Sequence, residues 1–345
     1  METRLLTSAP EDLALGAEII NRGGRVIFPT ETVYGLGANA LEEKAVRSIY
    51  DAKGRPTDNP LIVHIADFED VEALAETIPE KAKVLMEKFW PGPLTIILKR
   101  KPCVPDVVTA GLDTVGIRMP ENEIARAFIR ECGVPVAAPS ANVSGRPSPT
   151  KAEHVREDMN GKIDMLIDGG SVGIGLESTI MDMTVEPPML LRPGYITREM
   201  LEQTIGEIRI DPSLMEGVGE GVKPKAPGMK YRHYAPKAEL TIVEGELERV
   251  AEEINRLAQE KQEQGHSTGI IATEETKAFY KEAQVRVIGT RQDEETIARH
   301  LFAVLREFDE SGTEYIFSEA FSEENLGQAI MNRLVKAAGH HIIRV

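Results

Sequence analysis

The sequence predicts an α/β protein with two domains. Short apolar segments that suit buried strands alternate with longer amphipathic segments that suit helices, a pattern typical of α/β folds. The length of 345 residues favours two domains over one. Between residues 211 and 237 this alternation stops, and glycines and prolines become frequent. We therefore expect a first domain over residues 1–210, a linker over 211–237 and a second domain over 238–345.

In the first domain, apolar periodicity predicts a series of helices and buried strands. The segment 11–21 has helical spacing and ends at Gly23-Gly24, which suits the end of a helix. A second helix over 42–52 places Ala45 and Ile49 on one face. The further elements predicted are a helix over 122–131 and strands over 25–28, 61–65, 94–98, 115–117 and 134–138.

The second domain repeats the alternation of strand and helix more regularly. Four apolar runs read as strands, and the longest helical segment, 246–264, is heavily charged on its outer face and stops at Gly265. The strands are predicted over 240–243, 269–272, 285–288 and 315–318. This pattern predicts a small parallel sheet between two layers of helices. His340-His341 is not read as a metal site, because neighbouring residues on a strand face opposite sides.

Composition disfavours several kinds of partner. The formal charge of −16 argues against broad electrostatic binding to nucleic acid or anionic lipid. No apolar run approaches the length of a membrane span, and residues 1–10 lack the layout of a signal peptide, so we expect a cytoplasmic protein without membrane association. Cys103 and Cys132 lack metal-ligand spacing and are interpreted as ordinary thiols.

Polar or cationic side chains follow several of the predicted strands. Residues 29–37, with threonines, a tyrosine and two glycines, follow the first strand, and Lys53 and Arg55 come just after the next helix. The other polar positions near predicted strand ends are Asn59, His64, Arg118, Ser140, Asn142, Ser178 and Arg192. Ligands of open α/β sheets bind beyond the strand ends. We therefore expect these positions to meet at one edge of the sheet and bind an anionic small molecule.

Each of these signals also has a plainer interpretation. Lys53 and Arg55 could be a solvated helix end, where cations meet the helix dipole favourably. Ser140 and Asn142 could be ordinary turn caps. Gly35–Ala40 matches a loose dinucleotide fingerprint, but those glycines do not lie directly between a strand and a helix. Ser178 lacks the glycine-flanked elbow of a serine hydrolase, so we interpret it as a hydrogen-bonding residue.

The linker is unusual in composition. Residues 227–236 contain two tyrosines, a histidine, an arginine and a lysine, whereas a plain linker would be rich in glycine and serine or uniformly charged. Long loops that carry such side chains are more often functional than merely connecting. We interpret this segment as a lid.

These motifs together resemble the threonylcarbamoyl-AMP synthase family in its two-domain form. The resemblance covers essentially the whole chain. It implies a YrdC-like catalytic domain with a twisted mixed sheet and a smaller three-layer, Rossmann-like C-terminal domain. The motifs that carry it are Pro29-Thr30-Glu31-Thr32-Val33-Tyr34-Gly35-Leu36, Lys53-Gly54-Arg55-Pro56 with Asn59-Pro60-Leu61, Pro139-Ser140-Ala141-Asn142-Val143-Ser144-Gly145, and residues 227–236.

The resemblance also implies a role for each matching position. The family's catalytic residues correspond to Lys53, Arg55, Ser140 and Asn142. Its threonine-binding residues correspond to Thr32, His64, Arg118 and Ser178. Its ATP-binding residues correspond to Arg55, Asn59, Thr114, Ala138, Ser140, Ser148 and Arg192. The lid would be formed by Tyr231, Arg232, His233 and Tyr234, while the ligands of the metal stay unassigned.

The implied activity joins L-threonine, bicarbonate and ATP, with Mg²⁺, into threonylcarbamoyl-AMP and pyrophosphate. The product would supply downstream tRNA threonylcarbamoyl-transfer proteins that modify the adenosine beside the anticodon, and a weak direct contact with tRNA is possible on this view. Two alternatives stay open on the sequence. One is an RNA-binding module whose cations hold a phosphate backbone. The other is a carbamoyltransferase-like enzyme that acts on a different amine.

Overall fold

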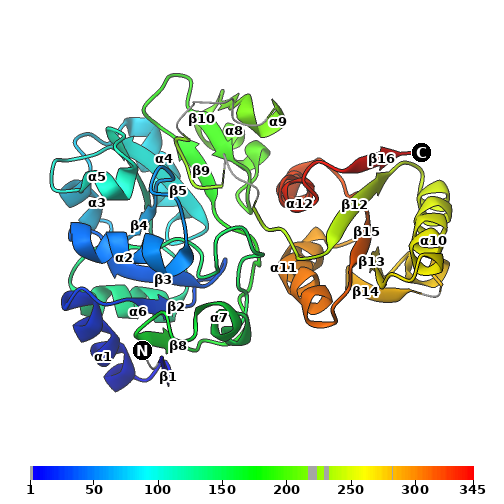
Figure 1. The fold of residues 1–345 in the computed structure, drawn as a ribbon. Coiled ribbons are helices and arrows are strands. Elements are labelled where there is room, and N and C mark those ends of the chain that lie inside the picture. Colours follow the sequence, from blue (N-terminus) through cyan, green and yellow to red (C-terminus); the bar gives the residue numbers. More distant parts are fainter. Residues whose placement is uncertain (1–2, 217–223, 229–232, 282) are drawn as a thin grey trace. The chain divides into compact units, whose positions relative to one another are not determined.

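The computed structural model describes residues 3–216, 224–228, 233–281 and 283–345 (Figure 1). The chain divides into two compact units. The first comprises residues 1–144, 148–173 and 177–231, and the second comprises 145–147, 174–176 and 232–345. The second unit therefore includes two short segments that the sequence analysis placed within the first domain. No helix in the described ranges is long and apolar enough to cross a membrane.

The first unit is built on a large mixed sheet, which is eleven-stranded in the described residues. In spatial order the strands are β1 (Arg4–Leu6), β8 (Met165–Ile167), β2 (Val26–Phe28), β3 (Gly35–Asn39), β7 (Val136–Ala137), β4 (Ile62–His64), β6 (Thr114–Arg118), β5 (Leu94–Lys99), β9 (Thr179–Asp182), β10 (Met189–Arg192) and β11 (Arg209–Ile210). The sheet confirms the predicted mixed-sheet class for this unit.

The directions of these strands correct one expectation. Strands β2, β5, β7 and β9 run one way, whereas β3, β4, β6 and β10 run the other way. The residues that follow β2 and β7 therefore leave the sheet at one edge, and those at the ends of β4, β6 and β10 lie at the opposite edge. The prediction that all the strand exits share one edge is wrong, because the strands of a mixed sheet end at both edges.

The helices of the first unit, in the described residues, are α1 (Pro10–Asn21), α2 (Glu43–Lys53), α3 (Asp70–Leu74), α4 (Glu80–Phe89), α5 (Asp106–Thr109), α6 (Glu123–Cys132), α7 (Ala152–Met159), α8 (Arg198–Ile205) and α9 (Ser213–Glu216). Helices α1, α2 and α6 match the predicted segments 11–21, 42–52 and 122–131 closely, and the unit contains further helices for which the sequence analysis gave no bounds. Alternate residues of β2 enter two different cores: Ile27 lies in one, and Val26 and Phe28 lie in the other, where Phe28 meets Phe128 of α6. The sheet is thus covered on both faces.

Strand β3 is an element that the sequence analysis missed. Residues 35–39 were interpreted as part of a polar loop, yet they form the second arm of a hairpin with β2, with Phe28 paired to Gly35 and Val26 to Gly37. Glycine is disfavoured in strands, so its presence hid the strand. Here Gly37 is required by packing, since an added Cβ would lie 2.8 Å from Val136 Cγ1 and 2.9 Å from Phe28 Cε1.

Replacing Gly37 with alanine is expected to lower the free energy of unfolding by about 1–3 kcal/mol, because the new methyl group overpacks a closed core. Urea unfolding followed by circular dichroism measures the change. The control is Gly173→Ala, where an added Cβ meets nothing within 4 Å and stability should stay the same. Equal stability of Gly37→Ala and wild type would contradict the argument.

The second unit is a parallel sheet in three layers, as predicted, with five strands in the described residues. The strand over residues 342–344 is one that the sequence analysis did not predict. Its strands lie in the order β14 (Gln284–Gly289), β13 (Thr268–Thr273), β15 (Tyr315–Glu319), β12 (Glu239–Glu244) and β16 (Ile342–Arg344). Its helices are α10 (Leu247–Glu263), η1 (Lys277–Phe279), α11 (Glu294–Glu310) and α12 (Asn325–Ala337). Helix α10 covers one face of the sheet, and α11 and α12 cover the other (Figure 1).

Candidate active site

Arg118, at the end of β6, is the centre of one buried polar group in the first unit. Only 4% of its side chain is exposed. Its Nη1 donates to Thr32 Oγ1 at 2.9 Å, its Nη2 donates to Glu31 Oε1 at 2.6 Å, and its Nε donates to the Gly92 carbonyl at 3.3 Å. Within the described part of the chain, these contacts engage three of the five N–H donors of the guanidinium group. A planar fork with donors to spare suits a carboxylate.

The loop 29–34 brings Glu31 and Thr32 to Arg118, although β2 and β6 run in opposite directions. Its conformation is held by Thr30, whose Oγ1 accepts from the backbone N–H groups of Thr32 and Val33 at 3.2 Å and donates to the Val33 carbonyl at 2.6 Å. A hydroxyl that bonds to nearby backbone is the usual way such turns are fixed. The loop is therefore ordered by its own sequence and delivers two side chains to the arginine.

His64 lies directly beside Arg118, because the two residues pair in register across β4 and β6. Burial, with the charge of Arg118 as a second cause, lowers the pKa of His64 from 6.5 to about 3. Its Nδ1 is buried and has no hydrogen-bond partner among the described residues. A ring with this pKa is neutral at ordinary pH and a weak base, so it suits hydrogen bonding to a ligand better than proton transfer.

The low pKa of His64 predicts a pH dependence of stability. Between pH 6.5 and about 3 the unfolded state binds a proton on this ring that the native state does not bind. Stability should therefore fall as pH decreases through this range, by at most about 1.4 kcal/mol per pH unit from this group. His64→Gln should show a shallower fall than wild type when urea unfolding is measured from pH 8 to pH 4. Identical pH slopes would contradict the prediction.

Ser178 and Arg192 form a second buried group next to the first. Arg192 donates from Nε to the Ser178 carbonyl at 2.9 Å and from Nη2 to Ser178 Oγ at 3.1 Å. Ser178 Oγ also lies 2.8 Å from Thr95 Oγ1 on β5, and β5 is the strand between β6 and β9. Thr95 was missed because its strand reads as a continuous apolar run. The group joins a residue predicted to bind threonine to one predicted to bind ATP.

Lys53 and the loop 139–145 form a third group. Lys53 is buried, and its Nζ donates to the carbonyls of Ser140 and Asn142, each at 2.5 Å. Ser140 Oγ donates in turn to Asn142 Oδ1 at 2.6 Å. The loop is tied to the β2–β3 hairpin through a bridge between Gly35 and Ser140. Lys53 thus fixes the backbone of the loop that presents the Ser140 and Asn142 side chains.

The remaining residues predicted to bind ATP lie near these groups in the sheet. Arg55 Nη2 donates to the carbonyls of Asn59 and Pro60, at 3.3 and 3.1 Å. The Ala138 N–H donates to the Ile62 carbonyl, which places this residue between β7 and β4. Ser148 Oγ donates to Glu177 Oε1 at 2.5 Å, immediately before Ser178. Glu177 is another residue that the sequence analysis did not single out.

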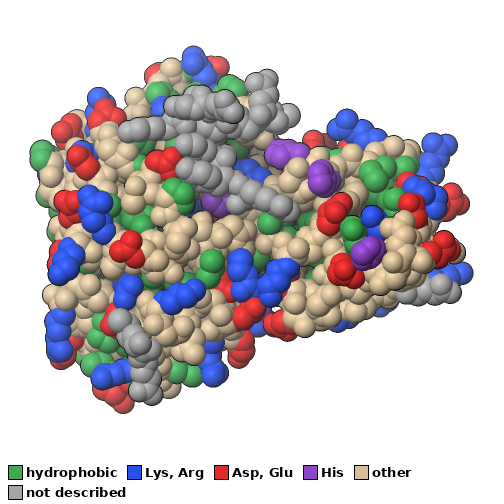
Figure 2. Space-filling view, viewed as in Figure 1, with side chains coloured by type: hydrophobic (Ala, Val, Ile, Leu, Met, Phe, Trp, Pro, Cys, Tyr) green, Lys and Arg blue, Asp and Glu red, His purple; other side chains and the backbone are tan. Residues whose placement is uncertain are grey.

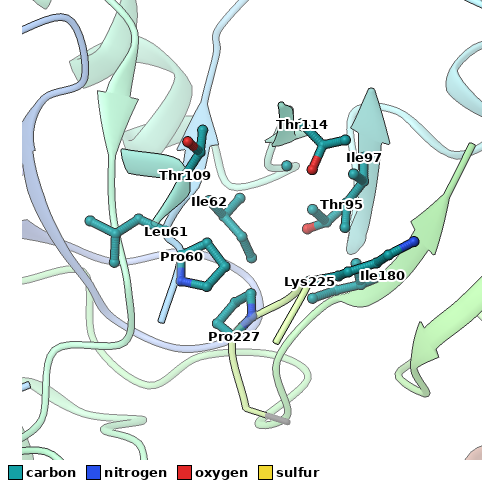
Figure 3. Close-up of a pocket in the computed structure, with 11 residues that line it drawn as sticks. Pro60, Leu61, Ile62, Thr95, Ile97, Thr109, Thr114, Ile180, Lys225 and Pro227 are labelled. Atoms are coloured by element: carbon teal, nitrogen blue, oxygen red, sulfur yellow. The ribbon is translucent and has the colours of Figure 1, made fainter. Parts of the chain in front are cut away.

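Thr114 lines a small cavity together with Thr95 and Pro60, and residues 224–228 close it (Figure 3). Its volume is about 10 Å³, which is room for a single water molecule and far too little for a nucleotide. The contacts that hold the closing segment include Lys225 Nζ to Asp182 Oδ2 at 2.9 Å and Arg192 Nη1 to the Pro227 carbonyl at 3.2 Å. This part of the linker is therefore anchored on β9 and β10.

The residues predicted to form a lid have different positions. Tyr231 and Arg232 lie outside the described residues. His233 and Tyr234 belong to the second unit, where the ring of Tyr234 is buried and stacks on Phe302 of α11 with centroids 5.1 Å apart. In this conformation Tyr234 is therefore a packing residue of the second unit.

Comparisons with known proteins place the chain in a family. Residues 18–194 match the domain family described as Telomere recombination, and residues 196–339 match the threonylcarbamoyl-AMP synthase C-terminal domain. The threonylcarbamoyl-AMP synthase of Bacillus subtilis is 52% identical over 344 residues, which cover 99% of this chain and 96% of that protein. The chain belongs to the threonylcarbamoyl-AMP synthase family, and the resemblance stated from the sequence is confirmed.

Two further relatives are equally informative. The threonylcarbamoyl-AMP synthase of Pyrococcus abyssi is 52% identical over 334 residues, with 96% of each chain covered. The crystal structure of P. abyssi Sua5 complexed with L-threonine matches with a TM-score of 0.94 at 48% identity and covers all of both chains. These matches confirm the two-domain fold class and the assignment to an enzyme family.

Proposed function

We propose that the protein joins L-threonine, bicarbonate and ATP into threonylcarbamoyl-AMP and pyrophosphate. The observation that carries the proposal is the buried guanidinium group of Arg118, held beside Thr32 and His64 with donors to spare. It is a binding place for an amino-acid carboxylate, in a chain whose P. abyssi relative has been solved with L-threonine.

The proposed chemistry needs little covalent work from the protein. The ammonium group of threonine first loses a proton to solvent. The free amine then condenses with bicarbonate to form a carbamate, and one water molecule leaves. A carbamate oxygen then attacks the α-phosphorus of ATP in line, and pyrophosphate leaves. The protein has to hold two anions together and neutralise the charge that develops between them.

The three buried groups divide this work. Arg118, Thr32 and His64 hold the amino acid. Arg192 donates to Ser178, which joins a residue assigned to threonine to one assigned to ATP. Lys53 fixes the loop that presents Ser140 and Asn142. We assign the binding of the ATP phosphates to this loop and to Arg55, because the resemblance to the family predicts Arg55 and Ser140 as ATP-binding residues.

Mg²⁺ is part of the same proposal. The described residues contain no cluster of three or more His, Cys, Asp or Glu side chains that could hold a metal ion. This fits Mg²⁺ that arrives with ATP, since the ion keeps several waters and needs only one or two carboxylates beside the phosphates. When bound, the ion supplies charge neutralisation at the phosphates.

The wider role also belongs to the proposal. We place the reaction in the cytoplasm, with the product passed to proteins that transfer threonylcarbamoyl to tRNA and with at most a weak direct contact with tRNA. The RNA-binding alternative gains no support from the face shown in Figure 2, where Lys and Arg are interspersed with Asp and Glu. A broad basic patch would be expected for that function.

The test is pyrophosphate release from ATP by the purified full-length protein with Mg²⁺. Release is expected to depend on both L-threonine and bicarbonate, and mass spectrometry of the other product should give threonylcarbamoyl-AMP. Equal release without threonine would overturn the assignment. Release supported as well by serine or another amine would favour the carbamoyltransferase-like alternative.

A further inference from the structure

Glu31 is a buried acid to which neither the motif analysis nor the proposed reaction gives a role. It is only 9% exposed, and its Oε1 accepts from Arg118 Nη2 at 2.6 Å. Its second oxygen, Oε2, is also buried and makes no hydrogen bond with any described residue. The carboxylate therefore has one oxygen committed to the arginine and one that lacks a donor.

A buried carboxylate oxygen without a donor is unfavourable. Leaving a buried acceptor unsatisfied costs about 1–3 kcal/mol, and more when the group is charged. Most such groups in native proteins have a partner, so each exception needs a specific explanation. His64 Nδ1, on the other residue adjoining Arg118, is buried and unpartnered in the same way. Two unsatisfied polar atoms beside one arginine indicate a place where a polar ligand completes the hydrogen bonding.

The charges of Arg118 and Glu31 match those of a free amino acid. In an amino acid the carboxylate and the ammonium group are attached to the same carbon, so the two charges are always close together. A carboxylate bound by the guanidinium group of Arg118 brings its ammonium group to the neighbouring acid, which is Glu31. When a zwitterion binds, Arg118 can contact its carboxylate and Glu31 can contact its ammonium group. The net buried charge does not change.

We propose that Glu31 binds the α-ammonium group of the substrate amino acid through Oε2 and so selects a free amino acid over other carboxylates. This deepens the proposed function and depends on Arg118 receiving the substrate carboxylate. The loop held by Thr30 positions Glu31 for this task. Glu31 is then a specificity residue for the first substrate to bind.

A purely structural role for Glu31 makes a different prediction. If the carboxylate only holds Arg118 in place, its loss should weaken the binding of every carboxylate ligand by the same factor. If it binds the ammonium group, its loss should weaken only ligands that carry one. The two roles are therefore separated by a pair of ligands that differ at this group alone.

The experiment is isothermal titration of the full-length protein with L-threonine and with the 2,3-dihydroxybutanoate in which a hydroxyl replaces the ammonium group. Glu31→Gln keeps a carbonyl acceptor for Arg118 but removes the charge. It should weaken threonine binding by about 10- to 100-fold, the range for a hydrogen bond between charged groups. Binding of the analogue, which is a net anion, should not weaken, because the loss of the Glu31 charge removes a repulsion between like charges.

Two further variants complete the design. Asp67→Asn removes an acid whose ion pair with Arg130 is about half exposed, and both ligands should bind it as they bind wild type. Glu31→Asp keeps the charge but is shorter by one methylene. Its affinity for threonine should lie between those of wild type and Glu31→Gln, and its affinity for the analogue should equal that of wild type. It also serves as the test variant if Glu31→Gln does not fold.

The outcomes are distinct. A selective loss of threonine binding supports the proposal. Equal losses for both ligands, or no loss for threonine, overturn it while the proposed function stands. A wild-type protein that binds no threonine overturns the proposed function, and this inference with it.

Discussion

Replacing Arg118 with glutamine is expected to abolish threonine-dependent pyrophosphate release and to lower the free energy of unfolding by about 3–5 kcal/mol. The stability loss follows because the change leaves the charge of Glu31 buried without its partner. The activity loss follows because the fork that receives the substrate carboxylate is gone. Urea unfolding and a pyrophosphate-release assay measure the two effects separately.

A second substitution separates the two effects of this change. In the double variant Arg118→Gln with Glu31→Gln, no charge is left unpaired, so most of the lost stability should return. Activity should not return, because the amino acid still lacks its anchor. Recovery of turnover in the double variant, or wild-type turnover in Arg118→Gln alone, would remove Arg118 from the substrate site.

Replacing Lys53 with methionine is expected to slow pyrophosphate release on the order of 100-fold, since a displacement of about 1 Å in a catalytic loop has that effect. The change removes the donor that holds the carbonyls of Ser140 and Asn142. Two buried acceptors lose a partner, so unfolding should also become easier, by about 1–3 kcal/mol for each acceptor.

The matched control is Lys162→Met. This lysine donates to one backbone carbonyl, that of Asp158, at 2.9 Å, and it lines the same open hollow as Lys53. Its loss removes an equal charge from the same part of the first unit but leaves the loop 139–145 in place. If both variants lose the same fraction of activity, the loss is due to the missing positive charge. The role given to the hydrogen bonds of Lys53 would then be wrong.

The sequence predicted the periodic elements well because their signal is local. Helices α1, α2 and α6 start and end within about two residues of their predicted bounds, since apolar spacing defines them and Asn122 also caps α6. Strand β3 escaped prediction because Gly35 and Gly37 weaken strand propensity, and the reason for those glycines is packing against Val136, far away in the chain. Local pattern carries no information about such a contact.

The residues of the candidate site were easier to find than their arrangement. Arg118 and His64 stood out as polar groups at the ends of apolar runs, and the structure places them in register. Strand direction could not be read from the same runs, because a buried strand has the same apolar pattern whichever way it runs. Glu31 was within a quoted motif, but only the coordinates show that one of its oxygens is buried without a partner.

The anchoring of Lys225 and Pro227 has a consequence for two strands of the first unit. Because Lys225 pairs with the fully buried Asp182 and the Pro227 carbonyl accepts from Arg192, the chain is fastened to the first unit at this point. Residues 225 and 227 therefore stabilise the ends of β9 and β10, although they lie more than 30 residues further along the chain.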